Sequence, residues 1–245
     1  GSAEATAPAA PADAAAEQAP SAPQERPEAP QPEAPAPLKT GTATTAASGE
    51  PEETLSLEDG REVLVYASEE SLAAAVPKVV ADAARAAIAE KGAFSMAVCG
   101  EEVALALRGL AAQPDLDFGR FHVFFCYDAL EAGAPASDAE AAGWLGACPV
   151  PAAQVHALPS GLPPEAAAAT YTATICMQPD EVVGDSEGGL PAVDLALLCT
   201  GDDGRCAGVR PGSPEAAALG SGQVVLFREG AAPALALSLD FLSAA

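Results

Sequence analysis

The chain has 245 residues and a formal net charge of −24 at neutral pH, with a sequence pI of about 4.1. This charge argues against nucleic acid as a partner, because no basic surface can displace counterions from phosphates, and against anionic membrane surfaces. No apolar run is long enough to span a bilayer, so we expect no membrane insertion. Six scattered cysteines without a C-x-x-C pair indicate reduced thiols in a reducing compartment. We expect that the protein binds no metal and no cofactor.

Residues 1–58 differ in composition from the rest of the chain. They are rich in Ala, Pro and Glu and carry almost no large apolar side chains. Such a segment cannot bury enough surface to offset the entropy lost on ordering. We therefore expect a disordered, partly extended tether over 1–58, followed by one folded domain over 59–245.

The domain alternates between predicted strands and helices. Ser68 caps the first helix, and Lys91-Gly92 ends it. Apolar residues recur along this helix at helical spacing: Leu72, Val76, Val79, Val80, Ala83, Ala87 and Ile88. Strands are predicted over 62–66, 93–99, 120–127, 154–158, 192–199, 223–227 and 234–242. Further helices are predicted over 101–112, over 138–145 and from 163 onward, with a loop over 129–137.

This alternation predicts an α/β fold with a doubly wound, mostly parallel sheet of Rossmann-like type, preceded by the disordered tail. In such sheets, ligands bind outside the carboxyl ends of the strands. The segments that follow Val98, Phe125 and Leu198 are therefore the candidate site. They read CGEEVA (99–104), CYDALE (126–131) and CTGDDGRCAGVRPG (199–212).

These loops and their flanks resemble the 6-phosphogluconolactonase family, within the glucosamine-6-phosphate isomerase/6-phosphogluconolactonase group, and the plant-type enzymes are the nearest. The similarity covers about 65–245 and includes the PAVDLALL stretch before the third loop. It implies hydrolysis of 6-phospho-D-glucono-1,5-lactone in the pentose phosphate pathway without a metal, in the plastid stroma or the cytoplasm. Family members continue past a strand that ends near Ala245, so we expect that this chain lacks their C-terminal piece.

The family's first loop is a Ser-Gly-Gly-Ser cradle for the substrate phosphate. Here its positions are Cys99, Gly100, Glu101 and Glu102. Two carboxylates stand where an anion is expected to bind, and each costs on the order of a kcal/mol at a separation of a few ångströms. Carboxylates also suit a helix N-terminus without any ligand, because they satisfy the helix dipole. The resemblance therefore implies a degenerate phosphate site.

The second loop has lost the family's arginine. Where the family has Asp-Glu-Arg, this chain has Tyr127, Asp128 and Ala129. Only one carboxylate is retained, that of Asp128, and no cation remains to face substrate charge.

The third loop keeps the family's turn residues but not its chemical groups. Gly201, Asp203 and Gly204 are retained, whereas Arg205 occupies the position of the histidine that acts as general base in the family. Arginine stays protonated at physiological pH, so it cannot accept a proton from water. Arg210 replaces an apolar residue of the same loop. The resemblance thus implies that no catalytic group is intact.

Three functions remain open. The leading hypothesis is a non-catalytic relative that acts as a scaffold or complex subunit with an unidentified protein partner, and the alternative is an active 6-phosphogluconolactonase. The third is a pocket repurposed for another ligand or metal through its arginines and four strand-end cysteines: Cys99, Cys126, Cys199 and Cys206. We also expect Arg205 and Arg210 to pair with Glu101 and Glu102 across the old pocket and close it.

Overall fold

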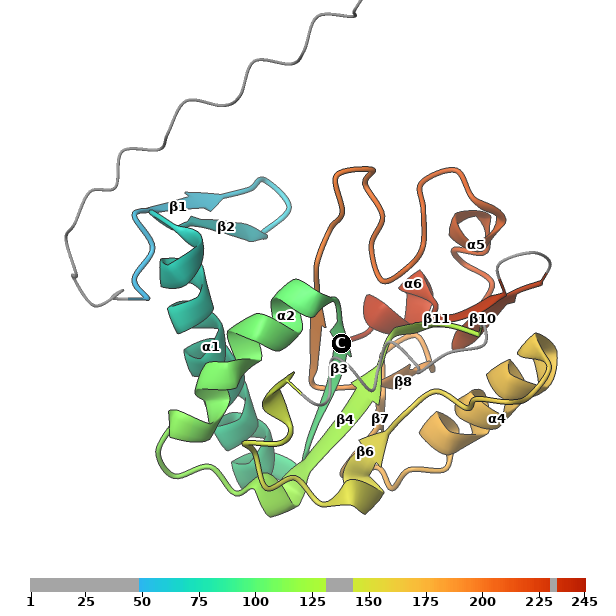
Figure 1. Ribbon diagram of the computed structural model, residues 1–245, viewed down its shortest axis with the longest axis horizontal. Helices are drawn as coiled ribbons and strands as arrows, with labels where there is room; N and C mark the ends of the chain where they lie inside the picture. Colours follow the sequence, from blue (N-terminus) through green and yellow to red (C-terminus); the bar gives the residue numbers. More distant parts are fainter. Residues whose placement is uncertain (1–48, 131–142, 230–232) are drawn as a thin grey trace, which may run out of the picture. The chain divides into compact units, whose positions relative to one another are not determined.

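A four-stranded parallel sheet lies at the centre of the fold. Strand β3 (Phe94–Cys99) runs between β4 (Phe121–Phe125) and β9 (Leu195–Leu198), and β6 (Val155–His156) extends the sheet beyond β4. The computed structural model describes residues 49–130, 143–229 and 233–245. Figure 1 shows α1 and α2 on one side of the sheet and α4 on the other. The predicted α/β class with a mostly parallel sheet is confirmed, and the tail predicted over 1–58 lies mainly outside the described residues.

Local chemistry sets both ends of helix α1 (Glu69–Lys91). Ser68 Oγ accepts a hydrogen bond from Ser71 N, and Gly92 ends the helix in the left-handed conformation with a φ of 89°. Both predicted ends are confirmed. The helix packs against β3 and α2 (Glu101–Ala106), and the predicted helix over 101–112 continues beyond α2 only as a 3-10 helix (Leu107–Ala112). Among the described residues, no helix is long and apolar enough to cross a membrane.

A second, antiparallel sheet contains β10 (Val225–Arg228), β11 (Ala234–Leu237) and β5 (Tyr127–Ala129). Cys126 joins the two sheets, because its N–H donates to Val98 O at 3.0 Å and its carbonyl accepts from Leu237 N at 2.7 Å. The strand predicted over 120–127 is therefore two strands that belong to different sheets.

The strand predicted over 234–242 is also too long. It ends at Leu237 because Ser238 Oγ accepts a hydrogen bond from Phe241 N and begins helix α6 (Leu239–Leu242). The predicted strand over 192–199 shortens to β9, because β8 (Pro191–Ala192) pairs instead with β7 (Gly184–Asp185). The predicted loop over 129–137 and helix over 138–145 fall largely on residues that the structure does not describe.

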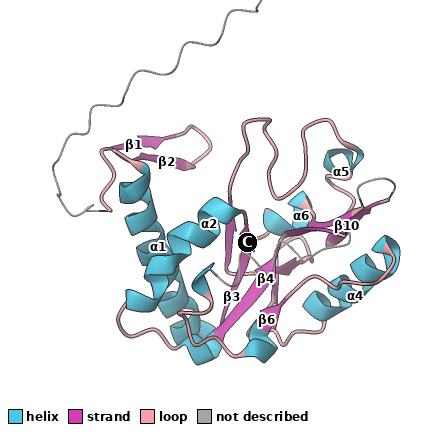
Figure 2. Ribbon diagram, in the orientation of Figure 1, coloured by secondary structure: helices cyan, strands magenta, loops and turns pink. Residues whose placement is uncertain are grey.

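The remaining elements lie at the periphery. Strands β1 (Glu53–Ser56) and β2 (Glu62–Val65) form an antiparallel hairpin, so the strand predicted over 62–66 does not join the main sheet (Figure 2). Because β1 falls inside the predicted tail, the folded unit begins before residue 59. Helix α4 (Pro164–Cys176) contacts β10 and β11, and α5 (Pro214–Ala217) follows the third loop.

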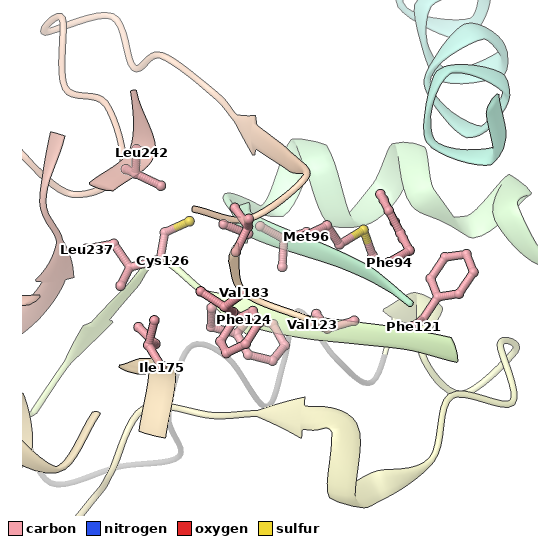
Figure 3. Close-up of a cluster of buried hydrophobic side chains, with 14 of the residues drawn as sticks. Phe94, Met96, Phe121, Val123, Phe124, Cys126, Ile175, Val183, Leu237 and Leu242 are labelled. Carbon is pink, nitrogen blue, oxygen red and sulfur yellow. The ribbon is translucent and has the colours of Figure 1, made fainter. Parts of the chain in front are cut away.

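Aromatic side chains fill the core around the parallel sheet (Figure 3). The rings of Phe94 and Phe121 from neighbouring strands meet edge to face, with centroids 5.0 Å apart. The buried Tyr171 of α4 donates its hydroxyl to the carbonyls of Phe125 and His156, both at 3.0 Å. These bonds tie α4 to the ends of β4 and β6, so the strand ends that carry the candidate loops are held in place.

Asp194 ties the start of β9 to the start of β3. Its Oδ2 accepts hydrogen bonds from Ser95 N at 2.8 Å and Ser95 Oγ at 3.1 Å, and its Oδ1 pairs with Lys91 Nζ at 2.9 Å. Ser95 is fully buried, and the side chains of Lys91 and Asp194 are only 25% and 22% exposed. The carboxylate therefore satisfies a buried N–H and a largely buried cation together.

We expect the Asp194→Ala variant to lose about 3 kcal/mol of unfolding free energy, because the Ser95 N–H loses its acceptor and Lys91 its counter-charge. The Asp194→Asn variant should lose less, since an amide oxygen can still accept from Ser95 N. Urea unfolding of both variants measures the difference. Equal losses below about 1 kcal/mol would show that this contact does not hold β9.

Both histidines of the chain lie together at the β4–β6 pair. His122 Nδ1 is 3.3 Å from His156 Nε2, and Gln154 Nε2 contacts His122 Nε2 at 3.1 Å. Burial, followed by the neighbouring His122, lowers the pKa of His156 to about 4. Burial also lowers the pKa of His122, although the charge of Glu181 opposes this shift. Both rings are therefore neutral at pH 7.

A depressed histidine pKa makes stability fall as the pH drops. Above pH 6.5 neither state binds these protons, whereas between pH 6.5 and about 4 the unfolded chain binds protons that the folded His156 resists. We expect a loss of about 1 kcal/mol between pH 7 and pH 5 from His156, after discounting for its partial exposure. Thermal unfolding at both pH values should show a smaller loss in the His156→Gln variant; an unchanged loss would contradict the assignment.

Candidate functional site

The three loops predicted to form the site meet at the carboxyl ends of β3 and β9. They line a pocket of about 450 Å³, in which Cys99 and Gly100 come from the first loop, Tyr127 from the second, and Cys199 and parts of 201–208 from the third. The parallel register brings them together, because Cys99 at the end of β3 lies opposite Leu198 at the end of β9. Strand order alone therefore predicted where this pocket lies.

Gly100 is required where the first and third loops touch. Its φ is 106°, which side chains disfavour, and the Sγ atom of Cys199 occupies the space that a Cβ would need. The Cys199 thiol also lies within 3.5 Å of the Cys99 carbonyl. Glu102 lies beside this contact, with Oε2 3.4 Å from the same Cβ position. The side chain of Glu101 falls outside the described part of the chain.

The two arginines of the third loop pair with a carboxylate of their own loop. Arg205 Nη2 lies 3.0 Å from Asp203 Oδ2, and Arg210 Nε lies 3.3 Å from the same oxygen. The prediction that they pair with Glu102 is wrong among the described side chains, because Glu102 lies beside Cys199 instead. Hydrogen bonds from Arg205 lower the pKa of Asp203, so this carboxylate is a weak base.

A tripeptide turn explains this pairing. Asp203-Gly204-Arg205 places Arg205 N 3.2 Å from Asp203 Oδ1, with Gly204 at a φ of 73°. The same tripeptide at 59–61 forms the same turn, with Arg61 N 3.2 Å from Asp59 Oδ1 and the guanidinium on the same carboxylate. The conformation of Arg205 therefore follows from local sequence and needs no ligand. The repeated Asp-Gly-Arg was the sequence signal that could have predicted this partner.

Tyr127 and Asp128 have different positions in the second loop. Tyr127 lines the pocket, and its ring packs over Gly208, whose φ of 78° and missing Cβ leave room for it. Asp128 is only 3% exposed and lies in β5 opposite Leu235, so it belongs to the second sheet rather than to the pocket wall. The contact between Tyr127 and Gly208 was not predicted from the sequence.

Two of the four strand-end cysteines, Cys99 and Cys199, line the pocket, and Cys206 lies near Cys99. Burial, followed by contact with Glu102, raises the pKa of Cys199 to about 11, and burial together with nearby Cys99 raises the pKa of Cys206. These thiols stay protonated at neutral pH and are poor nucleophiles. Cys126 is fully buried at the joint between the sheets. Within the described ranges, no group of three or more His, Cys, Asp or Glu side chains is arranged to hold a metal.

Comparison with known proteins shows the family. The family model described as "Glucosamine-6-phosphate isomerases/6-phosphogluconolactonase" matches residues 67–245, and the chain belongs to this family. "Probable 6-phosphogluconolactonase 3, chloroplastic" of Oryza sativa subsp. indica is 35% identical over 163 residues, which cover 62% of this chain and 49% of that protein. "6-phosphogluconolactonase 3, chloroplastic" of Arabidopsis thaliana is 31% identical over 163 residues, covering 63% and 50%. The resemblance to plant 6-phosphogluconolactonases is confirmed.

The chain spans about half the length of the curated relatives it matches. Solved structures support the fold as well. The 6-phosphogluconolactonase from Plasmodium vivax superposes with a TM-score of 0.62 at 12% identity, over 78% of this chain and 76% of that one. At this identity the likeness establishes the fold alone.

The Gly100→Ala variant should lose about 3 kcal/mol of stability, because the new Cβ meets both a disfavoured φ and the Cys199 thiol. Gly212→Ala is the matched control, since Gly212 has a φ of 74° but no atom within 4 Å of its Cβ position. This control should lose only about 1–2 kcal/mol from backbone strain. Thermal unfolding compares the two, and equal losses would show that the Cys199 contact is not tight.

Proposed function

We propose that this chain is a non-catalytic member of the family that acts as a scaffold or complex subunit. The observation that carries the proposal is the Asp203-Gly204-Arg205 turn, which holds a permanently charged guanidinium at the position where the resemblance implies the general base. The fold and the pocket are kept, while the group that would activate water is replaced.

Asp203, Cys199 and Cys206, in or beside the described part of the pocket, are poor substitutes for that base. The pKa of Asp203 is lowered by Arg205, and the raised pKa values of Cys199 and Cys206 keep their thiols protonated. The two histidines of the chain contact each other at the β4–β6 pair and do not line the pocket. A general base works best with a pKa near the operating pH, and the pKa shifts of Asp203, Cys199 and Cys206 all run away from neutral pH.

Charge in the pocket also opposes a phosphorylated substrate. Asp202 and Asp203 line it, and Arg205 is already paired with the second of them. Glu102 lies at the first loop, where the family places its phosphate cradle. Each unpaired carboxylate a few ångströms from a phosphate costs on the order of 1 kcal/mol with strong screening. Binding of the family's substrate is therefore weakened together with catalysis.

An active 6-phosphogluconolactonase is the second candidate. It is supported by the names of the plant relatives and by the open pocket of about 450 Å³ at the strand ends. In this alternative the chain hydrolyses 6-phosphogluconolactone in the pentose phosphate pathway. For either function we propose a plastid location, following the chloroplastic relatives.

A lactonase assay with the purified chain separates the two candidates. We expect no hydrolysis of 6-phosphogluconolactone above the spontaneous rate, because loss of the general base alone costs about 10²–10⁴ in rate. The rice relative, assayed alongside, shows that the substrate is intact. The Arg205→Ala variant is the matched control and should give the same baseline. Turnover well above background would overturn the proposal, and its loss in Arg205→Ala would show that Arg205 is catalytic.

A further inference from the structure

Exposed apolar side chains gather at the N-terminal end of the described chain. Twelve large hydrophobic residues are exposed in the described ranges, and seven of them fall within 25 residues of sequence: Leu55, Leu57, Val63, Leu64, Val65, Leu72 and Val79. Five belong to the β1–β2 hairpin and its turn, and two lie on α1. Single exposed residues need no explanation, but apolar side chains that share one face of an element can form the contiguous patch of an interaction surface.

The hairpin has one apolar face. In the antiparallel register Leu55 lies opposite Val63 and Glu53 lies opposite Val65, so Leu55, Val63 and Val65 point to the same side. We call these three residues the apolar face; they are 44%, 41% and 38% exposed. Leu64 is 42% exposed and points to the opposite side, with Thr54 as its cross-strand neighbour.

Nothing in the described chain buries the hairpin. No residue from 52 to 65 is buried, and Figure 1 shows the hairpin at the N-terminal end of α1, apart from both sheets. An isolated two-stranded hairpin is marginally stable in water unless something covers one side. A sheet face is covered either by another sheet or by a helix with an apolar stripe, and a helix suffices for a face as small as that of a two-stranded hairpin. The apolar face therefore fits a covering helix.

Charge around the hairpin selects the chemistry of that helix. Residues 52–70 carry seven exposed carboxylates, which form an acidic rim: Glu52, Glu53, Glu58, Asp59, Glu62, Glu69 and Glu70. The one basic residue of this stretch, Arg61, already pairs with Asp59 at 2.6 Å. A second copy of this chain would bring the same acidic rim to the contact, and an anionic membrane would repel it. A basic partner is attracted to this surface and gains association rate from the attraction.

We propose that the apolar face and the acidic rim form a docking surface for a basic amphipathic helix of a partner protein. The apolar stripe of that helix covers Leu55, Val63 and Val65, and its Lys and Arg side chains pair with the carboxylates of the acidic rim. This inference deepens the scaffold role proposed above by naming a surface and a class of partner. It does not depend on the loss of catalysis, because the hairpin residues do not line the pocket.

The test measures binding of a fluorescent 18-residue peptide, with Leu at helical spacing and Lys elsewhere, to the full chain by anisotropy. We expect a micromolar Kd that rises about threefold or more between 50 and 300 mM NaCl, since salt screens the rim. Val63→Lys should raise the Kd about tenfold, because it places a like charge in the apolar face. Leu64→Lys is the matched control: it adds the same charge at a neighbouring, equally exposed site on the other side.

The pair of variants separates a docking face from general charge attraction. Equal weakening by Val63→Lys and Leu64→Lys would overturn the proposal, as would a Val63→Lys variant that binds like the parent. Leu55→Gln removes the same contact without added charge, and it should also weaken binding. Sedimentation that shows a dimer lost in Val63→Lys, or binding to anionic vesicles, would assign the face to another occupant. Peptide binding by a chain that is also an active lactonase would leave this surface standing and refute only the proposed loss of catalysis.

Discussion

The pairing of β3 with β9 is the constraint on which the candidate site depends. At one end of the pair, Asp194 accepts two hydrogen bonds from Ser95 and holds Lys91. Four residues further along, the same register sets Cys99 opposite Leu198. Cys199 then follows directly and packs onto Gly100. A slip of one residue would exchange the faces of β9 and move Cys199 away from the first loop. A polar contact far from the pocket thus fixes the wall of the pocket.

Within the pocket, local interactions prevail over those that cross it. Arg205 pairs with Asp203 two residues away, so the pairing costs little additional side-chain entropy. A pair with Glu102 would cost more, because it would fix two long side chains from separate loops. The Asp-Gly-Arg turn at 59–61, which lies outside the pocket, has the same geometry. Both arginines of the third loop are therefore paired within the loop, and a pocket of about 450 Å³ remains at the strand ends.

Sequence patterns predicted those parts of the fold that depend on near neighbours. The ends of α1 follow from Ser68 and Gly92, and the position of the site follows from the order of strands and helices. The break at Cys126 was not predictable, because an apolar strand reads the same whether it pairs with β3 or with β11. The end of β11 was missed for another reason: Ser238 caps helix α6, but a serine at this position is equally compatible with a continuing strand. The partner of Arg205 and Arg210 was missed because the prediction paired them with carboxylates of another loop, whereas Asp203 lies within their own turn.

The two ends of the described domain differ in what they expose. At the pocket, Gly100 and Gly208 allow the close approach of Cys199 and Tyr127. The charged groups there pair with each other or stand where an anion would bind. At the hairpin, alternation puts Val63 and Val65 on one side and Leu64 on the other, with carboxylates around them. A chain that functions through its pocket has no need of an uncovered apolar face, which favours aggregation. A chain that functions through its surface does need one, and this asymmetry supports the scaffold role proposed above.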